Sequence, residues 1–247
     1  MTAAWHGENY DRSSDPQAHW GSDVVARMPA DLRGLVVDAG CGSGRVTEQL
    51  LERIPGASIL GLDASASMIA AASARLARYG DRISLHVHDL LEPLQLPELA
   101  SAIFSTGTFH WLHDHTALYR AMRAATLPNG LLVAQAGGRG SLDEVMDIIR
   151  GMNKELAELN YYASVSETTA SLKASGYEPI NVWLNEENVQ FDSRAAVAQF
   201  LTDAALGPHL ELVDTNERCE FVKQIVDALM GPRLQFVRLN IIARVTP

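Results

Sequence analysis

The chain has 247 residues, of which 47% are hydrophobic and 20% are charged, and its formal net charge is −10 at pH 7. This length fits one large α/β domain or two small ones, and the apolar fraction is enough for a continuous core, which excludes a disordered or fibrous chain. The acidic balance argues against nucleic acid or an anionic membrane as a partner, because both attract a basic protein surface. A local cluster of Arg or His could still bind a small anionic substrate.

The cysteines and the N-terminal residues indicate where the protein works. Only Cys41 and Cys219 are present, so no disulfide framework is expected, and a reducing compartment fits best. The first ten residues lack the basic and apolar regions of a signal peptide, and no run approaches the roughly 18 apolar residues that span a bilayer. We therefore expect a cytoplasmic protein; its oligomeric state cannot be read from the sequence.

Strands and helices alternate between residues 31 and 137. Short apolar runs predict strands, helical periodicity predicts helices, and Pro and Gly residues mark the ends of both. The expected strands are 35–39, 57–63, 83–88, 102–105 and 131–136, and the expected helices are 45–53, 65–79 and 116–126. This order predicts a parallel sheet with helices on both faces.

The pattern changes after residue 138 and becomes mainly helical. Helices are expected at 141–159, 166–175, 193–206 and 215–230, and strands at 179–184 and 234–245. These helices either decorate a single domain or form a cap over a pocket. We favour the cap, because an enzyme that acts on a small substrate has to exclude water from it.

A glycine-rich turn follows the first strand and precedes the first helix of this core. Gly40, Gly42 and Gly44 are spaced as G-x-G-x-G, and Asp38 stands two residues before the first glycine. Glycine permits a tight turn and lets backbone N–H groups approach a ligand. A carboxylate at this point would repel a pyrophosphate but suits a cationic amino-acid group. The turn therefore favours S-adenosylmethionine over NAD.

Two further carboxylates follow the next two strands. Asp63 ends the second strand, where it could accept hydrogen bonds from both ribose hydroxyls, and Asp89 follows the third strand, where it could accept from an adenine amine. Each alone could be a solvated strand end or a helix cap. Three acids at the same edge of a parallel sheet, where open α/β sheets bind ligands, together indicate a cofactor site.

Three motifs resemble those of class I S-adenosylmethionine-dependent methyltransferases: Val36-Val37-Asp38-Ala39-Gly40-Cys41-Gly42-Ser43-Gly44, Gly61-Leu62-Asp63 and His88-Asp89-Leu90. In that family the first acid and the glycines hold the methionine part, the second acid the ribose and the third the adenine. The cofactor-binding set assigned on this basis is completed by Ala64, Met68, Leu90 and Ser105.

Later stretches are similar to one branch of the family. The segment 102–112 resembles the fourth motif of trans-aconitate and malonyl-carrier-protein methyltransferases, and 200–210 and 238–244 look like the trans-aconitate branch. Two positions depart from it. Ser101-Ala102 stands where those relatives usually begin the motif with an acid, and Thr106 stands where Asn is frequent. The departures leave the substrate class open.

The resemblance implies a Rossmann-like α/β fold whose sheet is mostly parallel with an antiparallel last strand, and a helical cap. It implies one domain over residues 1–247, divided into N-terminal helices that cover the cofactor (1–30), a cofactor-binding core (31–137), cap helices with a sixth strand (138–232) and the last strand (233–247).

Two residues are candidates for catalysis. His110 follows the fourth strand and could bind or deprotonate the methyl acceptor, although it could equally cap the strand. Tyr10 lies in the segment that resembles the cofactor-covering helix, where its oxygen or ring face would suit a sulfonium; its aromatic ring could instead pack on the sheet. His113 and His115 are too sparse a pattern for a metal site, so no metal is expected.

The substrate is expected to be a small molecule held by Trp111, Arg139, Tyr161 and Trp183. An acid requires arginines, of which Arg139, Arg233 and Arg238 are available, whereas a wall of Trp and Tyr would suit an apolar acceptor. A pocket that contains Arg139 or Arg238 would favour the acid.

The leading hypothesis is O-methylation of a carboxylate. The alternatives are C- or N-methylation of a secondary metabolite, a homologue that binds the cofactor without methylating, and an NAD-dependent oxidoreductase.

Overall fold

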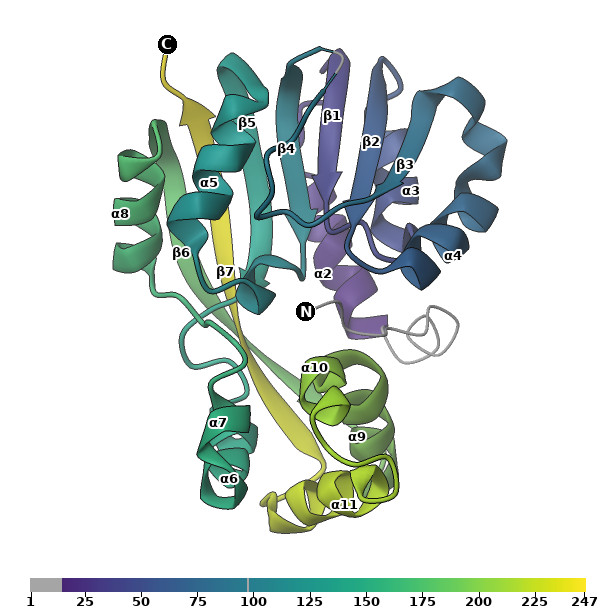
Figure 1. Ribbon diagram of the computed structural model, residues 1–247, viewed down its shortest axis with the longest axis vertical. Coiled ribbons are helices and arrows are strands. Elements are labelled where there is room, and N and C mark those ends of the chain that lie inside the picture. The colour runs from purple at the N-terminus through teal and green to yellow at the C-terminus, as the bar shows by residue number, and fades with distance from the viewer. Residues whose placement is uncertain (1–14, 97) are drawn as a thin grey trace.

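A computed structural model describes residues 15–96 and 98–247, with an open sheet at one end and a group of helices at the other (Figure 1). Tyr10 lies outside these residues, so its assigned role stays a prediction. No helix in the described part of the chain is long and apolar enough to cross a membrane.

The described residues form one seven-stranded sheet in the order β3-β2-β1-β4-β5-β7-β6. Neighbouring strands are parallel except for β7, which runs antiparallel to β5 and β6. The strands are β1 Gly34–Ala39, β2 Ala57–Asp63, β3 Ile83–Val87, β4 Ala100–Thr106, β5 Thr126–Gly137, β6 Tyr177–Gln190 and β7 Arg233–Val245. The predicted fold class, a mostly parallel sheet with an antiparallel last strand, is confirmed.

Helices cover both faces of the sheet. One face carries α2 Asp15–Val25, α3 Arg45–Arg53 and α4 Ala66–Leu76, and the other carries α5 His115–Ala124 and α8 Val165–Ala174. Because successive strand residues point to opposite faces, Val36 packs with the first group and Val37 with the second. Burial on both faces explains the continuous apolar runs by which these strands were predicted.

The remaining helices form the cap, which lies beyond the carboxyl edge of the sheet (Figure 1). It consists of α6 Asp143–Met152, α7 Lys154–Ala157, α9 Arg194–Phe200, α10 Gly207–Glu211 and α11 Arg218–Ala228. The long strands β6 and β7 leave the sheet and enter the cap, where Phe236 packs edge-to-face on Phe200 with ring centroids 5.7 Å apart. The cap therefore has an apolar core of its own.

Several element boundaries depart from those predicted, in the cap and also in the core, where β5 begins at Thr126 and not at 131. The expected strand 179–184 is the middle of β6, which pairs with β7 from Tyr177 to Gln190. The polar sequence around Glu186–Asn188 hid this length, because β7 supplies the hydrogen bonds whatever the side chains are. The expected helix 141–159 breaks at Asn153, which leaves helical geometry (φ −154°) and accepts from the backbone N–H groups that begin α7.

Two more helices end differently from their predicted limits. The helix expected at 193–206 ends at Phe200 and continues as a π-turn, η3 Leu201–Ala205, and the short α10 follows it. Helix α4 begins at the predicted cap, where Ser65 Oγ accepts from Met68 N, but gives way at Ala77 to a 3-10 helix, η1 Ala77–Arg82.

Candidate active site

A cavity of about 510 Å³ lies between the carboxyl edge of the sheet and the cap. Its walls on the sheet side include Gly40, Asp63 and Asp89, and its walls on the cap side include Phe200 and Phe236. This volume falls in the range of small-molecule sites, and the position is where open α/β sheets bind ligands.

The glycine turn forms the floor of the cavity below β1. A Cβ on Gly40 (φ +84°) would lie 2.0 Å from Thr108 Oγ1, so no other residue fits between β1 and the segment after β4. A Cβ on Gly42 would have no atom within 4 Å and would project into open space. Since Gly42 lines the cavity, no side chain at this position stands between a ligand and the backbone.

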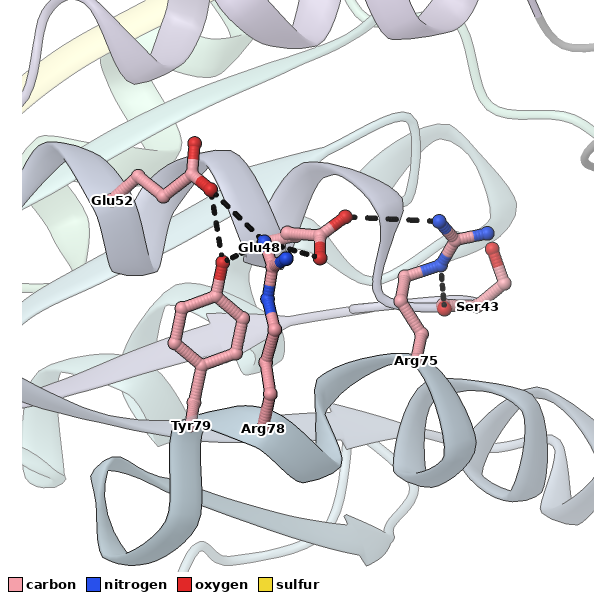
Figure 2. Close-up of polar contacts among 6 residues, drawn as sticks. All are labelled: Ser43, Glu48, Glu52, Arg75, Arg78 and Tyr79. Atoms are coloured by element: carbon pink, nitrogen blue, oxygen red, sulfur yellow. Dashed lines mark hydrogen bonds and ion pairs between the residues drawn. The ribbon is translucent and has the colours of Figure 1, made fainter.

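Contacts between α3 and α4 hold the turn from outside (Figure 2). Arg75 Nε donates to the carbonyl oxygen of Ser43, inside the turn, at 3.1 Å, and its guanidinium lies 3.8 Å from the Glu48 carboxylate. Arg78 adds ion pairs of 3.1 Å to Glu48 and to Glu52. These pairs contribute little free energy individually. Together they link α3 to α4 and to the 3-10 helix η1, in which Arg78 lies, and Arg75 connects them to the glycine turn.

Asp63 and Asp89 both line the cavity, as a cofactor role requires. Asp63 accepts from the backbone N–H groups of Gly42 at 3.0 Å and Ser65 at 2.8 Å, which fixes its carboxylate across the mouth of the turn. Burial raises the pKa of Asp63, and these two hydrogen bonds oppose that shift. Asp89 accepts from Leu91 N at 3.0 Å. Each carboxylate keeps lone pairs for hydroxyl or amine donors.

The other residues assigned to the cofactor divide into two groups. One group lines the cavity together with the two acids: Gly40, Gly42, Ala64, Met68 and Leu90. The second group, made of Asp38, Gly44 and Ser105, does not line it.

The second group supports the turn from behind. Asp38 is buried and accepts from Thr47 Oγ1 at 2.7 Å, and burial raises its pKa to about 7. The Ser105 hydroxyl donates to Ala39 O at 2.6 Å, and a Cβ on Gly44 would lie 2.9 Å from the Leu76 side chain. The structure therefore places these three residues beneath the binding surface.

His110 lines the cavity from η2 Phe109–Trp111, the short 3-10 helix after β4. The backbone N–H of Gly137 donates to His110 Nδ1 at 3.3 Å, so a neutral ring carries its proton on Nε2. Burial, with a contribution from the Arg238 charge, lowers the pKa of His110 to about 3. At neutral pH His110 is a hydrogen-bond donor, and the general-base interpretation loses its support.

Arg238 on β7 also lines the cavity, although it is almost fully buried. Its Nε donates to Gln135 Oε1 at 3.2 Å, and its guanidinium lies 4.5 Å from the centroid of the Trp20 ring. Gln135 in turn donates to Asn240 Oδ1 at 2.8 Å. This chain of buried amides and the aromatic ring fix the arginine in the wall.

Among the residues assigned to the substrate, Trp111 lines the cavity and three others do not. Arg139 is exposed and pairs with Glu167, whose two carboxylate oxygens lie 2.7 Å from Arg139 Nη2. The ring of Tyr161 packs edge-on against His115, with centroids 4.8 Å apart. The ring of Trp183 stacks under Arg27 at 4.8 Å. These three side chains are therefore held by other contacts outside the cavity.

Two other residues line the cavity instead, because their side chains point into it. Tyr162 lines the cavity where Tyr161 was expected, and its ring stacks on His110 with centroids 5.8 Å apart. Arg238 replaces Arg139. A signal for Arg238 was present in the sequence, because it follows Leu234 and Phe236 on one face of a long strand, and an arginine beside buried apolar side chains calls for a partner or a ligand.

The described residues contain no group of three side chains that could hold a metal ion. His113 Nε2 lies 3.2 Å from Leu159 O, and His115 Nε2 lies 2.9 Å from Phe109 O. Both rings therefore serve the local backbone.

Comparisons with known proteins agree with this geometry. Residues 36–130 match a family model described as a methyltransferase domain. The chain is 29% identical to a trans-aconitate 2-methyltransferase of Methylobacterium nodulans, over 89% of this chain and 86% of that protein. It is 26% identical to the protein of that name from Rhizobium meliloti, over the same shares of the two chains.

Residues 36–130 carry a methyltransferase domain, and the resemblance of the chain to S-adenosylmethionine-dependent methyltransferases is confirmed. The methyltransferase fold is shared with phosphoethanolamine N-methyltransferase 2 of Haemonchus contortus, solved with S-adenosyl-L-methionine, at a TM-score of 0.63 and 18% identity over 97% of this chain and 56% of that one. The observed site fits this cofactor, because Gly42, which has no side chain, and the Asp63 and Asp89 carboxylates all line the cavity.

Proposed function

We propose that this methyltransferase esterifies a carboxylate group of a small organic acid. The observation that carries the proposal is Arg238, a buried guanidinium in the cavity wall beside His110. Guanidinium matches a carboxylate in shape and charge, and a buried cation gains most from such a partner. An arginine in the pocket is also the feature that separates an acid from a purely apolar acceptor.

The sheet side of the cavity would hold the cofactor. Gly40, Gly42, Asp63 and Asp89 line this side. Gly40 and Gly42 would present backbone to its amino-acid part, Asp63 would accept from its ribose hydroxyls and Asp89 from its adenine amine. When bound, S-adenosylmethionine supplies a methyl group that is already activated on a positively charged sulfur. The task left to the chain is to aim the acceptor and exclude water.

A carboxylate acceptor suits the residues that face it. The oxygen that attacks already has a lone pair and no proton to lose, so the site needs no general base. His110, neutral with its proton on Nε2, and Arg238 can each donate to the acid. Donors on one oxygen would orient the other toward the methyl group. The acid would form a new O–CH3 bond with the methyl group that the cofactor supplies, and the electron pair of the broken S–CH3 bond would stay on sulfur.

The relatives add support from outside the structure. The curated relatives named above carry the name trans-aconitate 2-methyltransferase, which describes transfer to an organic acid. We propose further that the whole chain acts as one catalytic domain, because the cavity takes walls from both the sheet and the cap.

The test is transfer of a labelled methyl group from S-adenosylmethionine to a panel of mono-, di- and tricarboxylic acids. We expect a labelled product that mild base hydrolyses to methanol and the acid, as it does an ester. Transfer to an amine, phenol or carbon acceptor, with no acid accepted, would overturn the proposal. Asp81→Asn, on an exposed residue, serves as the matched control for variants of the site acids.

A further inference from the structure

The charged side chains that line the cavity limit the number of carboxylate groups that the substrate can carry. Among its described lining residues Arg238 is the one arginine or lysine, and four carboxylates lie there: Asp63, Asp89, Asp114 and Glu211. His110 adds no charge at neutral pH, since its pKa is lowered to about 3. One cation matches one carboxylate. A second or third carboxylate on the substrate would find no further Arg or Lys among these lining residues, and the carboxylates left there beside the two assigned to the cofactor, Asp114 and Glu211, carry the same charge as the substrate.

The cap side of the cavity is mostly apolar. Glu211 lies there, but most of its wall is formed by Leu142, Phe200, Ala204, Ala205, Leu212 and Phe236. A polar part of a substrate would find few partners among these side chains, whereas an apolar part would be removed from water by them.

The apolar wall begins directly beside the arginine. The Trp20 ring lies under the Arg238 guanidinium at 4.5 Å, and its other neighbour is the Phe236 ring, with centroids 5.0 Å apart. Phe236 precedes Arg238 by two residues on β7, a spacing of about 7 Å along a strand on the same face. Phe236 then meets Phe200 of the cap. A continuous aromatic surface thus leads from the guanidinium into the cap.

We infer that the methyl acceptor is an amphipathic monocarboxylic acid, with its carboxylate at Arg238 and its apolar body on the surface from Trp20 to Phe200. This inference rests on the proposed function and narrows it. It separates this chain from a site built for a multiply charged acid, which would need several converging cations.

The experiment compares kcat/KM for butanoate, hexanoate, octanoate and propane-1,2,3-tricarboxylate at saturating S-adenosylmethionine. We expect KM to fall about fourfold for each added methylene that is buried. We expect kcat/KM for the tricarboxylate to be at least tenfold lower than kcat/KM for octanoate. A KM that does not change with chain length would overturn the inference, and so would a kcat/KM for the tricarboxylate above that for octanoate. Either result would leave carboxylate methylation intact.

A cavity-filling variant tests the location of the tail without removing any packing. Ala204→Leu should lower kcat/KM for octanoate about tenfold and leave butanoate within twofold, because the added side chain occupies the space of roughly three methylenes. Ala195→Leu, on the exposed side of α9, is the matched control and should change neither. Equal effects of Ala204→Leu on both acids would place the tail elsewhere and overturn the inference. If no acid of any length is esterified, the proposed function itself fails, and with it this inference.

Discussion

The two walls of the cavity differ in how directly the chain determines them. The sheet wall is built from residues that each directly follow or end a strand, at the carboxyl ends of β1, β2 and β3: the glycine turn, Asp63 and Asp89. The cap wall is built from residues of η3, α10 and β7, brought together only by the packing of the cap. The first wall would serve a cofactor common to many enzymes, and the second would select the acceptor.

This difference leads to separate expectations for variants of the two walls. Changes in the cap wall should alter the KM of the acid and leave cofactor affinity alone, and changes in the sheet wall should do the reverse.

Arg238→Leu should have the largest effect. Removal of the guanidinium leaves the substrate carboxylate buried without a cation, so kcat/KM for the acid should fall about 100-fold. Affinity for S-adenosylhomocysteine, measured by calorimetry, should stay within threefold. Arg233→Leu, at the exposed start of the same strand, is the control, and Arg238→Lys should recover part of the loss. A parallel loss of cofactor affinity would show that the two walls are not separable.

Asp63→Asn tests the opposite wall. The amide replaces one acceptor by a donor, which then faces either the Gly42 N–H, the Ser65 N–H or the ligand. The Kd for S-adenosylmethionine should rise roughly tenfold, which corresponds to one lost hydrogen bond to a charged group. The KM of the acid at saturating cofactor should change by less than twofold, and Asp81→Asn should change neither. An unchanged Kd would remove Asp63 from the cofactor site.

The pH dependence of turnover tests the role of His110. Because its pKa is lowered to about 3, the ring stays neutral, and Nε2 keeps its single proton, throughout pH 5.5–8. His110→Phe should therefore lower kcat/KM by about tenfold at every pH in this range, with the loss of one donor. A titration near pH 6.5 in the unmodified enzyme that disappears in His110→Phe would instead identify a general base.

Asp38 gives a pH dependence of stability. Its pKa is raised to about 7 in the folded chain, above the value near 3.9 of an unfolded one, so the folded state holds an extra proton between these values. Stability should therefore fall as pH rises from about 4 to 7, and the deficit is complete above that range. Asp38→Asn without ligand should raise Tm by roughly 5 °C at pH 8 and have little effect at pH 4. Equal shifts at both pH values would contradict the assignment.

Arg75→Ala should have the smallest effect. It removes the hydrogen bond to Ser43 O and the pair with Glu48, both near the surface, and should lower Tm by about 2 °C. Arg120→Ala, exposed on α5, is the control for loss of a surface arginine. A loss of cofactor affinity above threefold would show that this contact sets the shape of the turn.

The sequence predicted the sheet wall well because local signals specify it. Strand 57–63, helix 45–53 and the three acids follow from periodicity and from glycine chemistry, and the structure brings two of those acids to the cavity. Asp38, the third acid, does not line the cavity. Its side chain is buried beneath the glycine turn and bonded to Thr47, and the sequence pattern does not specify this burial.

The cap wall could not be predicted in the same way. Tyr161 and Tyr162 are adjacent residues of the same type. Only the path of the chain between α7 and α8 decides which ring faces the cavity. Arg139 looked well placed at the end of a strand, yet Glu167, 28 residues later, holds it at the surface. Long-range packing and pairing of this kind leave no local pattern.

A crystal structure with S-adenosylhomocysteine and octanoate tests the central claim most directly. The account predicts the octanoate carboxylate within hydrogen-bond distance of the Arg238 guanidinium, with His110 Nε2 as a second donor and the alkyl chain along Phe236 and Phe200. A carboxylate bound away from Arg238, with the alkyl chain outside the cap, would contradict it.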